Sequence, residues 1–203
     1  MLLVYVGLMW IVRGLDVFLP NGMSVAGAGV VPRTLSGLWN IPIAPFIHGD
    51  FDHLLSNTVP LLILGTLILA RGVLEFVYVV LVSTFVCGLG TWIFGEGNAQ
   101  QIGASGVVFG FFGYLVFRIA FDRKISSALI ALAVAAGYGS AFAWSLIPEE
   151  QISWSGHFFG FIGGFLAARL RYPYRKLDVT PAMLASVIQF PTELQSPPAS
   201  RHH

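Results

Sequence analysis

Residues 102–120 read IGASGVVFGFFGYLVFRIA, an apolar run with a serine between glycines near its start. About 20 apolar residues in a helix cross the hydrocarbon layer of a bilayer, so this run predicts a transmembrane helix. Ser105 has two interpretations: it is a nucleophile, or it is a small residue that lets two helices pack. Small residues are common in membrane helices, and the stretch alone therefore favours packing.

The composition indicates a polytopic membrane protein with a single compact domain. Hydrophobic residues make up 56% of the 203 residues and charged residues 10%, against about 25% charged in a soluble domain. The net charge of +1 argues against a nucleic-acid partner. Cys87 is the one cysteine, which excludes a disulfide within the chain.

Six apolar segments are predicted to span the membrane, at about 2–19, 53–70, 73–94, 102–120, 125–146 and 153–170. Six crossings place both termini on one side. Of the loops on the opposite side, only the first carries a basic residue, Arg33. The ends on the side of the termini carry Arg71, Arg118, Arg123, Lys124, Arg169, Arg171, Arg175 and Lys176. The positive-inside rule therefore predicts cytoplasmic termini. The small size fits a bacterial plasma membrane.

Two segments depart from a plain helical bundle. The first outer connection, 20–52, is long and mixes prolines with apolar residues, so we expect it to be functional or partly embedded in the membrane. We divide the chain into a core at 1–172 and a mobile cytoplasmic tail at 173–203, where proline and serine are frequent. His202 and His203 resemble a tag remnant and are excluded.

Charged residues inside the predicted spans have simple interpretations. Arg13 and Asp16 are three residues apart, which predicts a local ion pair near the outer interface. Glu75, near the cytoplasmic start of its segment, is interpreted as a snorkelling or interfacial charge.

Polar residues meet at one depth of the predicted bundle. Three segments run inward from the outer side, and their first turns carry His53 and Asn57, then Ser105, then His157. His53 and Asn57 are four apart and share a helix face. Ionisable groups at membrane depth are costly and usually mark a functional site inside the bundle.

These residues suit nucleophilic catalysis. A serine hydroxyl needs a base within about 2.6–3.2 Å, and His157 is the candidate. No acidic residue lies at that depth on either segment, so we expect a dyad instead of a triad. His53, Asn57 and the Ser105 backbone N–H could stabilise an oxyanion. Alternatively, Asn57 makes an interhelical hydrogen bond that only holds the bundle together.

A Ser105–His157 dyad requires two helices to approach closely. Glycines would allow this contact, and the two segments supply Gly103, Gly106, Gly110, Gly156, Gly160 and Gly164.

A second cluster could suggest a metal site: His48, Asp50, Asp52 and His53. It lacks the histidine pair with an intervening glutamate that membrane metalloproteases use, so we predict neither a metal nor a cofactor.

Several motifs, in order and at the right segment ends, resemble the rhomboid intramembrane serine proteases: His48-Gly49, His53-Leu54-Leu55-Ser56-Asn57, Gly103-Ala104-Ser105-Gly106 and Gly156-His157-Phe158-Phe159-Gly160-Phe161-Ile162-Gly163-Gly164. The resemblance implies an all-α bundle of six transmembrane helices whose long first outer loop is partly embedded in the membrane. It also implies that Ser105 is the nucleophile and His157 the base, while His53 and Asn57 line the oxyanion site.

Two positions depart from the pattern of some family members. Trp39 is followed by Asn40, where those members have a Trp-Arg pair, so the first loop is anchored differently here. Phe109 stands where some have tyrosine; its ring can pack on His157 but lacks the hydroxyl.

The sequence therefore predicts a serine endopeptidase that cleaves peptide bonds in or near transmembrane segments of other membrane proteins. Its partners are these substrates and the lipid bilayer. The family resemblance implies substrates with a small residue before the cut. The oligomeric state is not predicted. Two alternatives stay open: a non-catalytic rhomboid-like protein that binds client helices, and a small transporter.

Overall fold

The computed structural model describes residues 1–19, 25–97, 100–147 and 154–176. Met1–Tyr172 form one compact unit, and Pro173–His203 form a second. The tail predicted from the sequence lies outside the described residues beyond position 176.

The described part of the chain is helical, which confirms the predicted all-α class. Its α-helices are α1 (Leu2–Val17), α2 (Leu35–Trp39), α3 (Phe51–Leu69), α4 (Val73–Phe94), α5 (Ser105–Asp122), α6 (Ile125–Ser145) and α7 (Trp154–Lys176). Two short 3-10 helices, η1 (Val25–Ala28) and η2 (Ala44–Phe46), lie in the first loop. An isolated antiparallel bridge joins Val30 to Gln101.

Within the described residues, four helices are long and apolar enough to cross a membrane: α3, α4, α5 and α6. Helix α1 has 16 residues, fewer than the roughly 20 that span a bilayer without thinning it. The total of six spans therefore stays a prediction.

Local signals fix where the helices that matter for the site begin. The Asp50 carboxylate accepts a 2.6 Å hydrogen bond from the His53 N–H, so it caps α3 and places His53 in the first turn. Gly103, just before α5, has a φ of 105°, a left-handed conformation that glycine adopts without steric cost.

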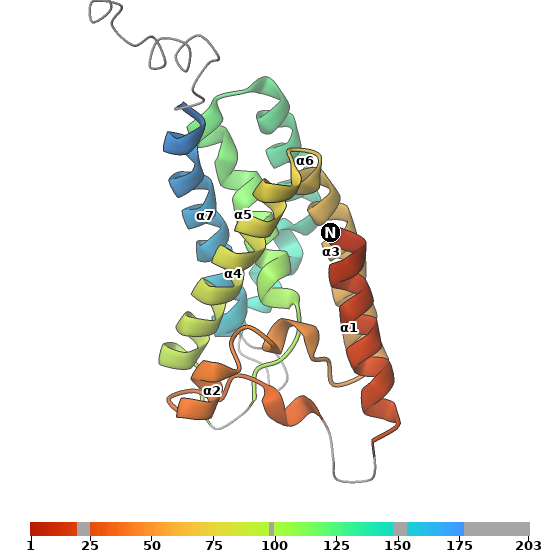
Figure 1. Ribbon diagram of the computed structural model, residues 1–203. Helices are drawn as coiled ribbons and strands as arrows, with labels where there is room; N and C mark the ends of the chain where they lie inside the picture. The colour runs from red at the N-terminus through yellow and green to blue at the C-terminus, as the bar shows by residue number, and fades with distance from the viewer. Residues whose placement is uncertain (20–24, 98–99, 148–153, 177–203) are drawn as a thin grey trace, which may run out of the picture. The chain divides into compact units, whose positions relative to one another are not determined.

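Helix α5 lies at the centre of the Met1–Tyr172 unit, in contact with α3, α4 and α6 (Figure 1). Its Phe111 and Tyr114 side chains are fully buried. Helix α1, in red, runs along α3, whereas α7, in blue, lies beside α4 and α5.

Glycine backbones form the contact between α5 and α7. A Cβ atom placed on Gly160 would lie 2.1 Å from the Gly106 carbonyl oxygen, and one on Gly164 would lie 2.0 Å from that of Gly110. No side chain fits between the helices at these points, so their backbones touch.

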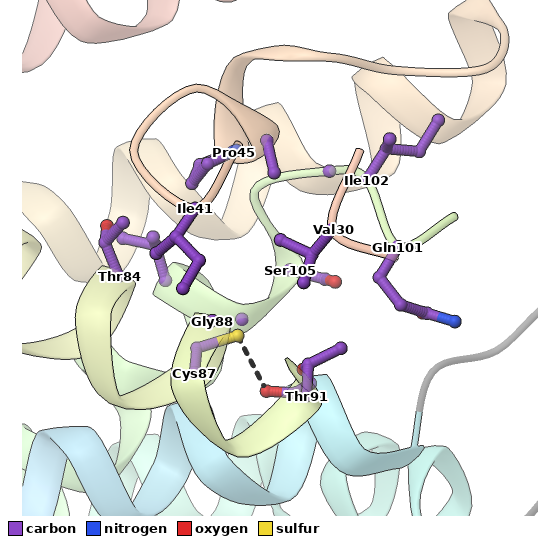
Figure 2. A pocket seen from close by; sticks show the side chains of 15 residues that line it. Val30, Ile41, Pro45, Thr84, Cys87, Gly88, Thr91, Gln101, Ile102 and Ser105 are labelled. Carbon is purple, nitrogen blue, oxygen red and sulfur yellow. Dashed lines mark hydrogen bonds between the residues drawn. The ribbon is translucent and has the colours of Figure 1, made fainter. Parts of the chain in front are cut away.

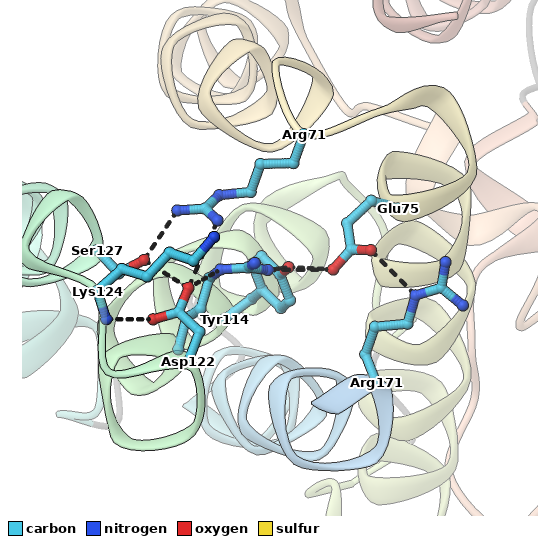
Figure 3. Close-up of polar contacts among 8 residues, drawn as sticks. Arg71, Glu75, Tyr114, Asp122, Lys124, Ser127 and Arg171 are labelled. Carbon is cyan, nitrogen blue, oxygen red and sulfur yellow. Dashed lines mark hydrogen bonds and ion pairs between the residues drawn. The ribbon is translucent and has the colours of Figure 1, made fainter. Parts of the chain in front are cut away.

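A buried polar network joins the other ends of the helices (Figure 3). Glu75 is only 3% exposed; it accepts hydrogen bonds from Tyr114 and Arg118 of α5 and from Nε of Arg171 on α7, the last at 3.0 Å. Interpreting Glu75 as a snorkelling charge was therefore wrong, because arginines from two neighbouring helices converge on it inside the bundle. Arg118 also pairs with Asp122 at 2.8 Å.

The predicted ion pair in α1 is confirmed. Nη1 of Arg13 lies 2.6 Å from Oδ2 of Asp16. The other Asp16 oxygen accepts a 2.8 Å hydrogen bond from the Val25 N–H, so the pair also holds the start of η1.

Candidate active site

Ser105 and His157 lie in direct contact at the starts of two helices. Ser105 is the first residue of α5, and His157 lies in the first turn of α7. Nε2 of His157 is 2.9 Å from Oγ of Ser105, which is a hydrogen-bond distance.

The second ring nitrogen of His157 sets the tautomer. Nδ1 lies 3.2 Å from the carbonyl oxygen of Ser145. A carbonyl oxygen can only accept, so Nδ1 carries the proton and Nε2 keeps its lone pair for the Ser105 hydroxyl. This is the arrangement that a general base requires.

Sequence reasoning missed the role of Ser145. Its carbonyl is available because α6 ends at this residue, and the last carbonyls of a helix have no partner within the helix. Every residue has a backbone carbonyl, so the residue type at position 145 does not indicate this role. The predicted end of the segment at 125–146 was the one sequence signal for a carbonyl without a helical partner.

An aromatic ring packs on the imidazole. The centroids of the Phe109 and His157 rings are 4.7 Å apart at an angle of 54°, which confirms that Phe109 can pack there without a hydroxyl.

His53 and Asn57 lie against the segment that leads into Ser105. A Cβ atom on Gly103 would lie 2.7 Å from Nε2 of His53 and 3.7 Å from Nδ2 of Asn57. The Asn57 amide donates a 2.9 Å hydrogen bond to the His53 carbonyl. Both residues belong to α3, so this bond lies within one helix and does not join two helices, as the alternative interpretation of Asn57 required. The four predicted polar residues are thus gathered around the start of α5.

His48 contacts the same segment. It is 1% exposed, and its Nε2 accepts a 3.3 Å hydrogen bond from the Ala104 N–H. Burial, and secondarily the neighbouring His53, lower the pKa of His48 to about 4, so the ring stays neutral and can accept. The sequence placed His48 in a possible metal cluster and in the His48-Gly49 motif, but it assigned His48 no role at the site. Among the described residues, no three His, Cys, Asp or Glu side chains are grouped to hold a metal.

A small cavity of about 40 Å³ lies beside Ser105 (Figure 2). Its walls come from the first loop, from α4 and from the segment before α5, and they include Ile41, Pro45, Thr84, Cys87, Gly88 and Ile102. A water molecule needs roughly 10–15 Å³ on this measure, so the cavity has room for a few waters.

Comparison with known proteins identifies the family. Residues 35–174 match the family model of the Rhomboid domain. An uncharacterized protein of Mycobacterium tuberculosis is 34% identical over 177 residues, which cover 83% of this chain and 73% of that protein. An uncharacterized protein of Mycobacterium leprae is 30% identical over 83% of this chain and 69% of its own length. The rhomboid protease GluP of Bacillus subtilis is 28% identical over 64% of this chain and 25% of its own length.

The chain is therefore an integral membrane protein that belongs to the rhomboid family, and this membership supports an intramembrane protease function.

Proposed function

We propose that this protein is an intramembrane serine endopeptidase that hydrolyses peptide bonds in or near transmembrane segments of other membrane proteins. The 2.9 Å contact between Ser105 Oγ and His157 Nε2 carries the proposal, since the Ser145 carbonyl holds the imidazole in the tautomer of a base. Family membership supports the reaction class.

Ser105 is the nucleophile of the proposed reaction, and His157 carries out its proton transfers. Ser105 Oγ attacks the carbonyl carbon of the substrate while its proton moves to Nε2 of His157. His157 then protonates the leaving amine. In the second half it takes a proton from the water that attacks the acyl-enzyme, and it returns that proton to Ser105 Oγ as the C–Oγ bond breaks.

Three groups are positioned to stabilise the oxyanion. The Ser105 N–H belongs to the first residue of α5, where backbone N–H groups lack intrahelical partners and the helix dipole favours negative charge. The His53 and Asn57 side chains border Gly103, two residues earlier. Donors of this kind are worth about 2.7–4 kcal/mol each in a preorganised site.

The cavity beside Ser105 supports a substrate with a small residue before the cut. Its volume is about 40 Å³, and Gly88, Gly103, Gly106 and Gly156 contribute to its lining. A small side chain or the hydrolytic water could occupy it, whereas a large ring could not.

The proposed topology has six spans, with both termini in the cytoplasm of a bacterial plasma membrane. The distribution of charge supports it: Arg71, Arg118 and Arg171 gather at the end of the bundle opposite Ser105. We also propose that residues 1–172 carry the activity and that the tail is dispensable.

Reconstitution in liposomes with a model transmembrane substrate tests the function. The wild-type protein should cleave the substrate, and Ser105→Ala and His157→Ala should each lose at least about a hundredfold in rate. A fluorophosphonate probe should label Ser105. Ser56→Ala is the matched control, because Ser56 is an exposed serine on the neighbouring α3 whose hydroxyl, among the described residues, donates to the His53 carbonyl.

Two results would contradict the proposal: absence of cleavage by the wild type, or equal cleavage by Ser105→Ala. Binding of substrate helices without cleavage or labelling would instead identify a non-catalytic member of the family.

A further inference from the structure

Arg33 fastens the first loop to the C-terminal end of α4. Its guanidinium Nη1 donates to the carbonyl oxygens of Ile93 at 3.2 Å and Gly95 at 2.9 Å. Its backbone N–H donates to the Trp92 carbonyl at 3.0 Å. The Trp92 indole N–H returns a 2.7 Å bond to the Thr34 carbonyl. We call these four bonds the Arg33–Trp92 clasp.

The clasp meets a need of α4. This helix ends at Phe94, and the last carbonyls of a helix lack intrahelical partners. Arg33 satisfies two of them, those of Trp92 and Ile93, from outside the helix. Its own backbone is held at a φ of 59°, which is unfavourable for a non-glycine residue. The side-chain bonds hold the chain in that conformation.

The same loop is bonded to the segment that precedes Ser105. Val30 and Gln101 exchange two backbone hydrogen bonds of 2.9 Å, and the Gly103 N–H donates to the Ala44 carbonyl at 3.0 Å. The Asn40 amide donates to the Gly29 carbonyl at 3.0 Å and closes the loop on itself. Hydrogen bonds therefore fasten the first loop at two places: to the end of α4, and to Gln101 and Gly103 before α5.

We propose that Arg33 is a positioning residue: by clasping the first loop to α4, it holds residues 101–104, and hence Ser105 and its N–H, in the reactive geometry. This inference rests on the proposed function.

The experiment compares two glycine substitutions. Arg33→Gly removes the guanidinium and relieves the backbone. Arg123→Gly does the same at the other non-glycine residue with positive φ among the described residues, at the end of α5 far from Ser105 along the helix. Backbone relief is common to both variants, so any difference between them reports the clasp.

The readout is the rate at which a fluorophosphonate labels Ser105, measured with thermal unfolding and with cleavage of a transmembrane substrate. We expect Arg33→Gly to lower the labelling rate between about tenfold and a hundredfold at temperatures where it is folded, because small displacements of reacting groups cost that much. The labelling rate of Arg123→Gly should stay within about twofold of the wild-type rate, because this substitution should not displace the reacting groups.

Milder variants cover the case in which Arg33→Gly does not fold. Trp92→Phe removes only the indole donor to Thr34, and Arg33→Lys keeps the charge but loses the planar guanidinium whose Nη1 makes both bonds. Both should label more slowly than the wild type and faster than Arg33→Gly where that variant folds.

The outcomes separate the two proposals. If the wild type is labelled and folded Arg33 variants are labelled equally fast, the positioning role is wrong, even if their substrate cleavage falls. If the wild type is not labelled at Ser105, the proposed function itself fails.

Discussion

Nε2 of His157 lies 2.9 Å from Oγ of Ser105, although 52 residues separate them in the sequence. The contact depends on the glycine backbones beneath it, since Gly160 touches Gly106 and Gly164 touches Gly110. The spacing of α5 and α7 therefore determines whether a hydroxyl and an imidazole form a dyad.

Gly160→Ala should separate the two helices. The new methyl group would lie 2.1 Å from the Gly106 carbonyl oxygen, which is backbone and cannot rotate away. We expect a loss of about 1–3 kcal/mol in the free energy of unfolding from overpacking, and a fall in cleavage rate of at least about tenfold. Denaturant unfolding and cleavage assays measure both.

Gly137→Ala is the control for that change. Apart from the backbone of α6 itself, no atom of the described residues lies within 4 Å of a Cβ placed at Gly137, so alanine should stabilise the helix by about 0.5–1 kcal/mol. Equal effects of the two substitutions would show that the α5–α7 contact has no special role.

Phe109→Ala should loosen the imidazole of His157, whose ring centroid is 4.7 Å from that of Phe109. An aromatic contact is worth about 0.5–1.5 kcal/mol, so kcat should fall by at most about tenfold while KM changes little. Phe109→Tyr keeps the ring and should keep the rate. A KM effect without a kcat effect would indicate that Phe109 contacts the substrate instead.

Glu75→Gln should strongly destabilise the fold. The carboxylate is 3% exposed and pairs with Arg118 and Arg171, which would lose their buried counter-charge. Removing one partner of a buried pair costs about 3–5 kcal/mol. Glu96→Gln, at an exposed carboxylate, should change the unfolding free energy by less than about 0.5 kcal/mol. A small effect at Glu75 would mean that water reaches the network.

His48 should make stability depend on pH. Its pKa in the folded protein is about 4, against an ordinary value of 6.5, so the unfolded chain binds more protons between these values. Above pH 6.5 the neutral His48 contributes its full share to the free energy of unfolding. As the pH falls toward 4, this contribution decreases by about 3 kcal/mol. His48→Gln should flatten this part of the profile of unfolding free energy against pH. An unchanged profile would contradict the assignment.

Much of the fold could be predicted from local properties of the sequence. Helix class follows from the length of the apolar runs, because a bilayer requires backbone hydrogen bonds within each span. The predicted directions of the segments put His53, Asn57, Ser105 and His157 at one depth, and helical periodicity put glycines on the faces of two segments. These inferences depend only on the lengths of the apolar runs and on how far apart the residues lie in the sequence.

Only the tertiary structure decided the contacts between distant segments. The Ser145 carbonyl that orients His157 is a backbone atom and carries no residue identity, and Glu75 is buried because arginines from α5 and α7 converge on it. The Arg33–Trp92 clasp likewise joins residues about 60 positions apart in the chain. Hydropathy and motifs determine which groups reach the same depth, whereas packing of whole helices determines which of their atoms meet.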